Sequence, residues 1–196
     1  MKKILQKNEP VLRKIAEEIK LSDIGTPKIQ KVLKEMTTSL ASQSDGVAIA
    51  APQIGYSLRI FVVAGKIFTK EFSDQGVSQA DAPRNSADSA ESDSDPEQRN
   101  SFVKDVKDLV FINPKISRLS KDKEWVPEGC LSVRPIYDKT YRSLKATVTA
   151  YDEKGKKFTR GASGLLAQIF QHETDHLNGI LFIDHAKDLK EEELPK

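Results

Sequence analysis

The sequence predicts an α+β domain, because helical and strand-like patterns occur in one chain of ordinary domain length. Apolar residues recur at helical spacing in 163–177, whereas they alternate with polar residues in 145–159. A third segment, 59–64, is almost entirely apolar, as expected of a buried strand. The chain has 196 residues, enough for a sizeable core, and we expect 1–196 to form a single domain.

The composition excludes several classes of protein. Charged residues make up 31% of the chain and hydrophobic residues 38%, which is typical of a soluble globular protein. No apolar run approaches the length of a membrane span, and the start of the chain lacks the apolar core of a secretory signal. The single cysteine, Cys130, cannot form an intrachain disulfide and fits a reducing compartment. We therefore expect a cytoplasmic protein that does not bind membranes.

Residues from about 66 to 104 differ in composition from the rest of the chain. They are polar, acidic and small, so they cannot bury enough apolar area to offset the entropy lost on ordering. We expect a mobile surface insertion, either an inert solvated loop or a regulatory or partner-binding segment. Residues 71–99 carry a net charge of −6, which leaves +8 on the remainder of a chain whose net charge is +2. The basic remainder indicates either an anionic partner such as RNA or a solvated lysine-rich surface, and we expect no direct binding to DNA.

Two helical segments are expected near the start of the chain. The first is a short amphipathic segment after Pro10, with apolar side chains at Val11, Leu12, Ile15, Ala16 and Ile19. The second is a clearer helix that Thr26 caps and that has Pro27 in its first turn. Its buried stripe is expected to comprise Ile29, Val32, Leu33, Met36 and Leu40.

The segment 47–55 is small and apolar apart from Gln53. Small residues let backbone segments approach closely, so this segment suits a crowded place in the fold. A glutamine among apolar neighbours either finds polar partners and faces a cleft, or lies at the surface beside a turn.

Further strands are expected in the second half of the chain. Residues 109–116 have strand character, and 145–159 predict a hairpin with its turn at 152–155. Residues 180–183 form a short apolar run, which we interpret as a strand. His185 follows this run and is expected to lie at the surface without a ligand role.

The most informative stretch is 171–176, which reads Gln-His-Glu-Thr-Asp-His. Residues four apart lie one turn apart on the same helix face, so His172 and His176 can direct two imidazoles at one metal ion. Glu173 lies beside them and can move a proton to or from a water molecule at the metal. The alternative is a core helix that carries two histidines by chance.

Cys130 supplies a third ligand of the expected metal site. Two imidazoles and one thiolate make three protein ligands and leave a fourth position open, which is the arrangement of a catalytic metal. A soft thiolate suits zinc or ferrous iron. The alternative for an isolated cysteine is a small buried hydrophobic residue.

Three motifs in the same order make the chain resemble the peptide deformylase family. They are Gly-Val-Ala-Ile-Ala-Ala-Pro-Gln at 46–53, Glu-Gly-Cys-Leu-Ser at 128–132 and Gln-His-Glu-Thr-Asp-His-Leu-Asn-Gly at 171–179. The resemblance covers nearly everything except the acidic insertion. It implies small antiparallel sheets around a central metal-binding helix. It also implies a hydrolase that removes the N-terminal formyl group from N-formylmethionyl nascent polypeptides and releases formate.

The resemblance implies a role for each residue that matches the family's motifs. Cys130, His172 and His176 would hold one divalent metal ion, expected to be ferrous iron and replaceable by zinc, nickel or cobalt. Glu173 would take a proton from the attacking water and pass it to the leaving amine. The side chain of Gln53 and the backbone N–H of Leu131 would donate hydrogen bonds to the developing oxyanion.

The substrate cleft is expected along the first motif, at Gly46, Val47 and Ala48. We further expect Val126, Leu165 and Ile169 to contact the methionine side chain together with Val47. Ala48 departs from the family pattern, which has glycine at this position. An added methyl group could narrow the cleft, and a positive φ there would be costly. We also expect Glu128 and Arg142 to pair and hold the cysteine loop.

Three other functions are compatible with parts of the sequence. A zinc peptidase shares the His-Glu-x-x-His helix but usually takes a histidine or carboxylate as third ligand. A binding protein would retain the fold while Ala48 weakens catalysis, and a thiol enzyme would use Cys130 as nucleophile. The ribosome is a candidate partner, although the short tail of mixed charge after His185 lacks the basic helix by which some family members are thought to dock there.

Overall fold

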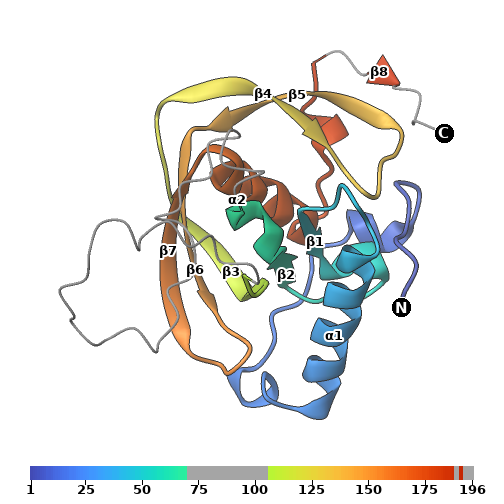
Figure 1. Cartoon of the computed structure of the whole chain (residues 1–196), viewed down its shortest axis with the longest axis vertical. Coiled ribbons are helices and arrows are strands. Elements are labelled where there is room, and N and C mark those ends of the chain that lie inside the picture. Colours follow the sequence, from blue (N-terminus) through green and yellow to red (C-terminus); the bar gives the residue numbers. More distant parts are fainter. Residues whose placement is uncertain (70–105, 188–189, 192–196) are drawn as a thin grey trace.

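The computed structural model, which describes residues 1–69, 106–187 and 190–191, contains two antiparallel sheets in this described part (Figure 1). The larger sheet has the strand order β1-β2-β3-β6-β7. Its strands are β1 (Ala48–Ala50), β2 (Ile60–Val63), β3 (Leu109–Leu119), β6 (Lys145–Tyr151) and β7 (Lys157–Ser163). The smaller sheet, with the order β4-β5-β8, contains β4 (Lys123–Gly129), β5 (Ile136–Ser143) and β8 (Lys190–Glu191).

Helix α2 (Gly164–Leu177) lies inside the fold and contacts strands of both sheets (Figure 1). The fully buried side chains of Leu166, Phe170 and Leu177 face the larger sheet. The ring of Phe170 lies 6.2 Å from that of Phe61 and 5.2 Å from that of Phe111, measured between centroids. This packing fixes the rotation of α2 and leaves its histidine-bearing face toward the smaller sheet. The α+β fold around a central helix is therefore confirmed.

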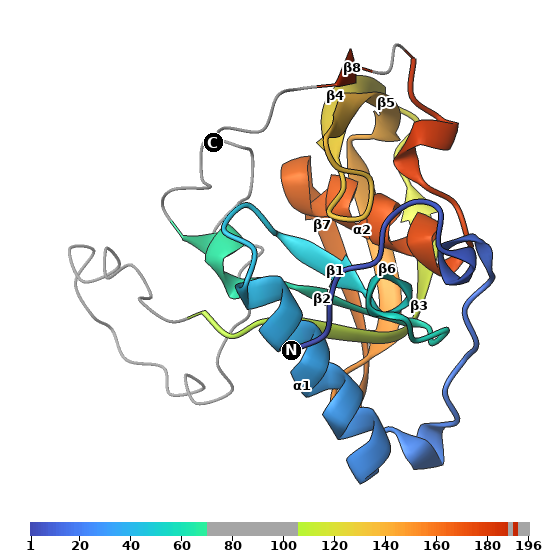
Figure 2. The same ribbon diagram turned by 90° about the vertical axis from the view of Figure 1, so that its right-hand side faces the viewer.

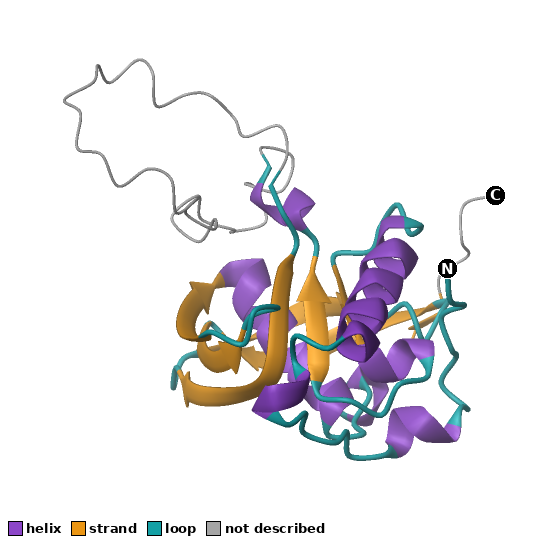
Figure 3. Ribbon diagram, turned by 90° about the horizontal axis from the view of Figure 1, so that it is seen from below, coloured by secondary structure: helices purple, strands orange, loops and turns teal. Residues whose placement is uncertain are grey.

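Helix α1 (Pro27–Ala41) covers the other face of the larger sheet (Figure 2). Its predicted stripe is confirmed, because Ile29, Val32, Leu33, Met36 and Leu40 are all buried. They pack against residues of β1 and β2 that alternate with those facing α2, such as Ile49 and Val62. Seen from below, helical segments lie on both sides of the strands (Figure 3). Strands β1 and β2 of the larger sheet are thus buried on both faces, which explains why 60–64 is continuously apolar.

The predicted hairpin is confirmed as β6 and β7, which pair from Lys145 with Ser163 to Tyr151 with Lys157. The inward-facing Ala146, Val148 and Ala150 are all buried, as the alternation predicts. The segment after Pro10 is only a short 3-10 helix, Pro10–Arg13, in which Leu12 is buried. Ile15 was expected on the apolar face but is 74% exposed.

The strand expected at 180–183 is wrong. Phe182–Asp184 form a 3-10 helix instead. The carboxylate of Asp184 accepts a hydrogen bond from the backbone N–H of Leu181 at 2.9 Å and pairs with Arg13 at 2.5 Å. The local bond to Leu181 curls the chain where its apolar composition alone favours extension, and the long-range pair with Arg13 holds Asp184 in place.

The acidic insertion expected at about 66–104 lies outside the described residues from position 70 onward. The part before it ends in a short 3-10 helix, Gly65–Phe68. Among the described helices, none is long and apolar enough to cross a membrane.

Candidate metal centre

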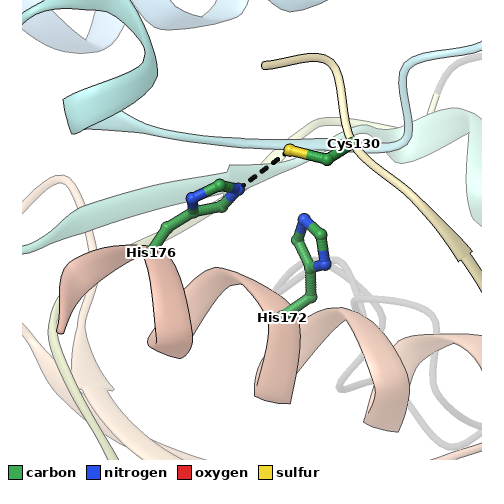
Figure 4. Close-up of side chains that lie close together, drawn as sticks. All are labelled: Cys130, His172 and His176. Atoms are coloured by element: carbon green, nitrogen blue, oxygen red, sulfur yellow. Dashed lines mark hydrogen bonds between the residues drawn. The ribbon is translucent and has the colours of Figure 1, made fainter. Parts of the chain in front are cut away.

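The two histidines lie one turn apart on the face of α2 that the larger sheet does not cover. Their ring centroids are 4.8 Å apart, and the rings are nearly perpendicular. His176 is 1% exposed, and the side chain of His172 is 11% exposed. Figure 4 shows both rings directed toward Cys130. The helix therefore presents two ring nitrogens to one point in space.

Cys130 comes from the smaller sheet, directly after the end of β4. Its Sγ lies 3.2 Å from Nε2 of His176 (Figure 4), and one donor atom from each of the three residues falls within 4.8 Å of the others. Cys130 is 8% exposed. The structure thus brings together the three metal ligands that the sequence predicts.

The donor set fits a single metal ion. Metal–ligand bonds of about 2.0 to 2.3 Å place the donor atoms of a tetrahedral site roughly 3.3 to 3.8 Å apart. Small side-chain rotations close the difference from the observed separations. One thiolate and two imidazoles are ligands of zinc and ferrous iron, and three protein ligands leave a position open for substrate.

Glu128 orients His172 from outside the ligand set. Its Oε1 forms a hydrogen bond with Nδ1 of His172, which leaves Nε2 of that ring for a metal. Arg142 donates to both carboxylate oxygens of Glu128, at 2.8 and 3.0 Å, and its Nη1 donates to Asp175 at 2.6 Å. The predicted pairing of Glu128 and Arg142 is confirmed. Through the bonds to His172 and Asp175, this pair links β4, which directly precedes Cys130, to α2.

The buried charges of this network shift the pKa values of its members. Burial raises the pKa of Glu128, but hydrogen bonds and charges from His172 and Arg142 outweigh it and hold that pKa well below its ordinary 4.5. Burial lowers the pKa of His172, yet its bonds and charge interactions with Cys130 and Glu128 raise it well above 6.5. For His176, burial and the charge of His172 lower the pKa well below 6.5.

Glu173 directly follows His172 on α2 and lines a pocket together with Cys130 and His172. It is 3% exposed, and its Oε2 has no hydrogen-bond partner within the described part of the chain. Burial is the largest cause that raises its pKa, to about 7. A carboxyl group with a pKa near neutrality can accept a proton in one step and donate it in the next.

Gln53 is buried beside Cys130, which decides between its two predicted placements. It is 1% exposed, and its Oε1 accepts a hydrogen bond from the backbone N–H of Ala50 at 2.8 Å. Its Nε2 donates to Oγ of Ser132 at 3.1 Å and lies 3.6 Å from Sγ of Cys130. Leu131 follows Cys130, and its carbonyl accepts a hydrogen bond from the side chain of Gln6 at 3.1 Å. Gln53 and Leu131, the residues expected to supply the oxyanion donors, thus both lie next to Cys130 and line the same pocket.

A pocket of about 290 Å³ opens in front of these residues. Besides Cys130, His172, Glu173, Gln53 and Leu131, it is lined by five of the six expected substrate-contacting residues, namely Gly46, Val47, Ala48, Leu165 and Ile169. The sixth, Val126, is not among the lining residues, whereas its neighbour Pro127 is. Val126 shares a face of β4 with Glu128, but it lies just outside the continuous stretch 127–131 that lines the pocket.

Ala48 adopts ordinary strand backbone geometry, so the cost expected of a positive φ does not arise. Within the described residues, Asn113 is the non-glycine residue with a positive φ. Ala48 pairs with Val63 in the sheet and is 6% exposed. What it adds to the pocket is a methyl group.

Two charged residues at the pocket were missed by the sequence analysis. Nη2 of Arg134 contacts both carboxylate oxygens of Asp45, at 2.5 and 2.7 Å. Both residues line the pocket. Their positions directly before the first motif and shortly after the second were the signal that could have indicated them.

Comparisons with known proteins find one family that matches nearly the whole chain. A family model described as polypeptide deformylase matches residues 1–192. A peptide deformylase of Desulforudis audaxviator is 34% identical over 93% of this chain and 92% of its own length. Peptide deformylase 1A, chloroplastic/mitochondrial, of Arabidopsis thaliana is 36% identical over 92% of this chain, which spans 60% of that protein.

Solved structures give the same result. A peptide deformylase from Synechococcus elongatus in complex with actinonin superimposes with a TM-score of 0.70 at 28% identity, covering 95% of this chain and 79% of that one. A Met-Ala-Ser bound peptide deformylase from Acinetobacter baumannii also gives a TM-score of 0.70, at 26% identity, covering 93% of this chain and 96% of that one.

Proposed function

The chain belongs to the polypeptide deformylase family, whose members are metal-dependent hydrolases that remove N-terminal formyl groups, and on this premise we propose how its own residues perform that reaction. The observation that carries the proposal is the meeting of Cys130, His172 and His176 at the base of a pocket that Glu173 also lines. We assign the first three residues to the metal and Glu173 to proton transfer.

The donor set suits zinc or ferrous iron. We propose ferrous iron, the metal that the family resemblance implies, with zinc, nickel and cobalt as ions that can replace it. When bound, the ion supplies Lewis-acid chemistry, because it polarises a carbonyl oxygen and lowers the pKa of water. The Cys130 thiolate offsets part of the ion's positive charge, so acidification of water is weaker than with three neutral imidazoles. A neighbouring base therefore matters more, and Glu173 is that base.

Glu173 acts twice in the proposed reaction. It first accepts a proton from the water that attacks the formyl carbon, and it then donates a proton to the amine that leaves. Its burial favours both steps, because a pKa of about 7 keeps both protonation states accessible at neutral pH. Its unpartnered Oε2 is the atom we assign to this transfer.

The oxyanion that develops on the formyl group needs hydrogen-bond donors. We assign Nε2 of Gln53 and the backbone N–H of Leu131 to this role. The bond from Ala50 to Oε1 of Gln53 fixes which end of the amide faces Cys130. Loss of one oxyanion donor typically lowers the rate by about a hundredfold to a thousandfold.

The substrate we propose is a polypeptide that begins with N-formylmethionine. Val47, Leu165 and Ile169 supply an apolar wall for the methionine side chain, and Gly46 and Ala48 lie along its backbone. The Met-Ala-Ser bound to the Acinetobacter baumannii relative supports this class of substrate, because it is the peptide that deformylation of formyl-Met-Ala-Ser leaves. We do not assign Val126 to the methionine site, because it is not among the residues that line the pocket.

Substitution of cobalt for the native metal tests the ligand assignment. Cobalt bound through a thiolate gives a charge-transfer absorption band that nitrogen and oxygen ligands do not give. We expect this band in the wild-type protein and its loss in Cys130→Ser. A wild-type protein that binds cobalt without the band would contradict the assignment of Cys130. Chelation should also abolish formate release, whereas a thiol enzyme would keep its activity.

We further infer that residues 1–196 form one domain, which the family match over 1–192 supports. We place the activity in the cytoplasm near the ribosome, since formylated polypeptides emerge there. Co-sedimentation of the full chain with ribosomes at low and moderate salt tests the latter point, and equal amounts of unbound protein with and without ribosomes would contradict it.

A further inference from the structure

We propose that Thr140 is a positioning residue of the metal centre, because its hydroxyl fixes the Glu128 carboxylate that orients His172. This inference rests on the proposed metal site. Thr140 is not among the residues that line the pocket and is not one of the three ligands, so its effect is expected to act through Glu128.

Thr140 reaches Glu128 diagonally across two neighbouring strands. In the register of β4 and β5, Thr140 lies opposite Val126, whereas Glu128 lies opposite Asp138. Thr140 and Glu128 are therefore diagonal neighbours on one face of the smaller sheet. Thr140 is 1% exposed, and its Oγ1 donates a hydrogen bond to Oε2 of Glu128.

The carboxylate of Glu128 is held by two donors on each oxygen. Oε1 is bonded to His172 and to Nη2 of Arg142, and Oε2 to Nε of Arg142 and to Thr140. Without the threonine hydroxyl, the carboxylate keeps its bond to His172 and two bonds to Arg142. The latter two come from a single guanidinium group. The carboxylate can then rotate with Arg142, and Oε1 moves relative to the imidazole ring.

His172 is the metal ligand that depends on this arrangement. Its Nδ1 is bonded to Glu128, and this bond sets the direction of Nε2. Nδ1 of His176, by contrast, is buried and has no hydrogen-bond partner within the part of the chain that the structure describes. A disturbance of Glu128 is thus expected to reach the metal through His172.

Thr140 also offers a cleaner test than Arg142. Replacement of Arg142 removes a positive charge from a buried network and changes its electrostatics together with its geometry. Thr140→Val removes one hydroxyl, keeps the side-chain volume and leaves the charge unchanged. Any effect on the metal therefore reports how well the carboxylate is positioned.

The experiment measures how fast cobalt-loaded protein loses its metal to a chelator, followed by the thiolate absorption band. Direct partners of metal-bound histidines change metal affinity by about tenfold to a hundredfold, so a donor one step further out is expected to change the release rate by about threefold to tenfold. We expect this acceleration in Thr140→Val and near-wild-type release in Thr140→Ser, which keeps the hydroxyl. Melting curves of the metal-free proteins report the stability of each variant separately.

Two comparisons show whether Glu128 carries the effect. In a Glu128→Gln background, Thr140→Val is expected to add nothing, because the carboxylate that it positions is already gone. Thr149→Val is the matched control, since Thr149 lies in the other sheet and bonds to Thr159 at an exposed site. Wild-type release rates in Thr140→Val, or the same acceleration in the Glu128→Gln background, would overturn the proposal. The proposed function fails by a different result, the absence of a thiolate-bound metal in the wild-type protein.

Discussion

Replacement of Arg142 by leucine should destabilise this protein strongly at neutral pH. The guanidinium is 9% exposed, and its main partner, the carboxylate of Glu128, is 3% exposed. Removal of one member of a buried ion pair costs about 3 to 5 kcal/mol, because the other charge remains buried without compensation. For a chain of this length, that loss lowers the melting temperature by roughly 6 to 20 °C.

Chemical unfolding of the metal-free proteins measures this loss. The double variant Arg142→Leu/Glu128→Gln should recover much of the lost stability, because the unpaired carboxylate of Glu128 is removed as well. The pH dependence has a definite sign. The pKa of Glu128 lies well below 4.5 in the folded protein, so its contribution to stability is present above that pH and disappears as the pH falls toward the folded pKa. The difference between wild type and Arg142→Leu should therefore shrink in acid.

A loss of less than about 1 kcal/mol at pH 7 would refute the reasoning, since it would match an exposed ion pair rather than a buried one. A difference that stays the same between pH 7 and pH 3 would also refute it, because Glu128 would then not be the group left without compensation.

Three further predictions concern the pocket and the metal. Ile169→Lys should raise KM for formyl-Met-Ala-Ser at unchanged metal content, and an unchanged KM would remove Ile169 from the methionine site. Zinc added to metal-free protein in weak buffer at pH 7 should release protons, because the pKa of His172 is raised and a ligand must be deprotonated; a constant pH would contradict this. The iron-loaded enzyme should lose activity in air while the nickel-loaded enzyme keeps it, and equal lifetimes would argue against a reactive iron–thiolate site.

The sequence predicted those parts of the fold in which burial follows a period. Helix α1 and the hairpin of β6 and β7 have one apolar side each, and both lie where the pattern indicates. The metal ligands could be predicted because the histidine spacing is a property of the helix itself. The cysteine loop could be predicted because its motif is local.

Strands β4 and β5 were not predicted from the sequence, and the reason is physical. Their inner face carries Glu128, Thr140 and Arg142, all buried, whereas Trp125 and Tyr141 are 46% and 54% exposed on the outer face. Polar residues inside and aromatic residues outside invert the usual alternation. The inversion exists because this sheet holds the network behind His172, so the functional requirement hides the structural signal.

Other outcomes depend on contacts that no local pattern contains. Gln53 is buried because Ala50 and Ser132 satisfy its amide, and Ser132 is distant in sequence. Residues 180–183 are too short a run to distinguish a strand from a turn, and the bond from Leu181 to Asp184 decides the outcome.

The central claim is that Glu173 performs proton transfer beside a metal held by Cys130, His172 and His176. Formate release from formyl-Met-Ala-Ser tests it most directly, with protein loaded anaerobically with ferrous iron and compared with Glu173→Gln of equal metal content. We predict rapid release by the wild-type enzyme and almost none by the variant. Equal rates for the two, or no release by fully metallated wild-type protein, would contradict the claim.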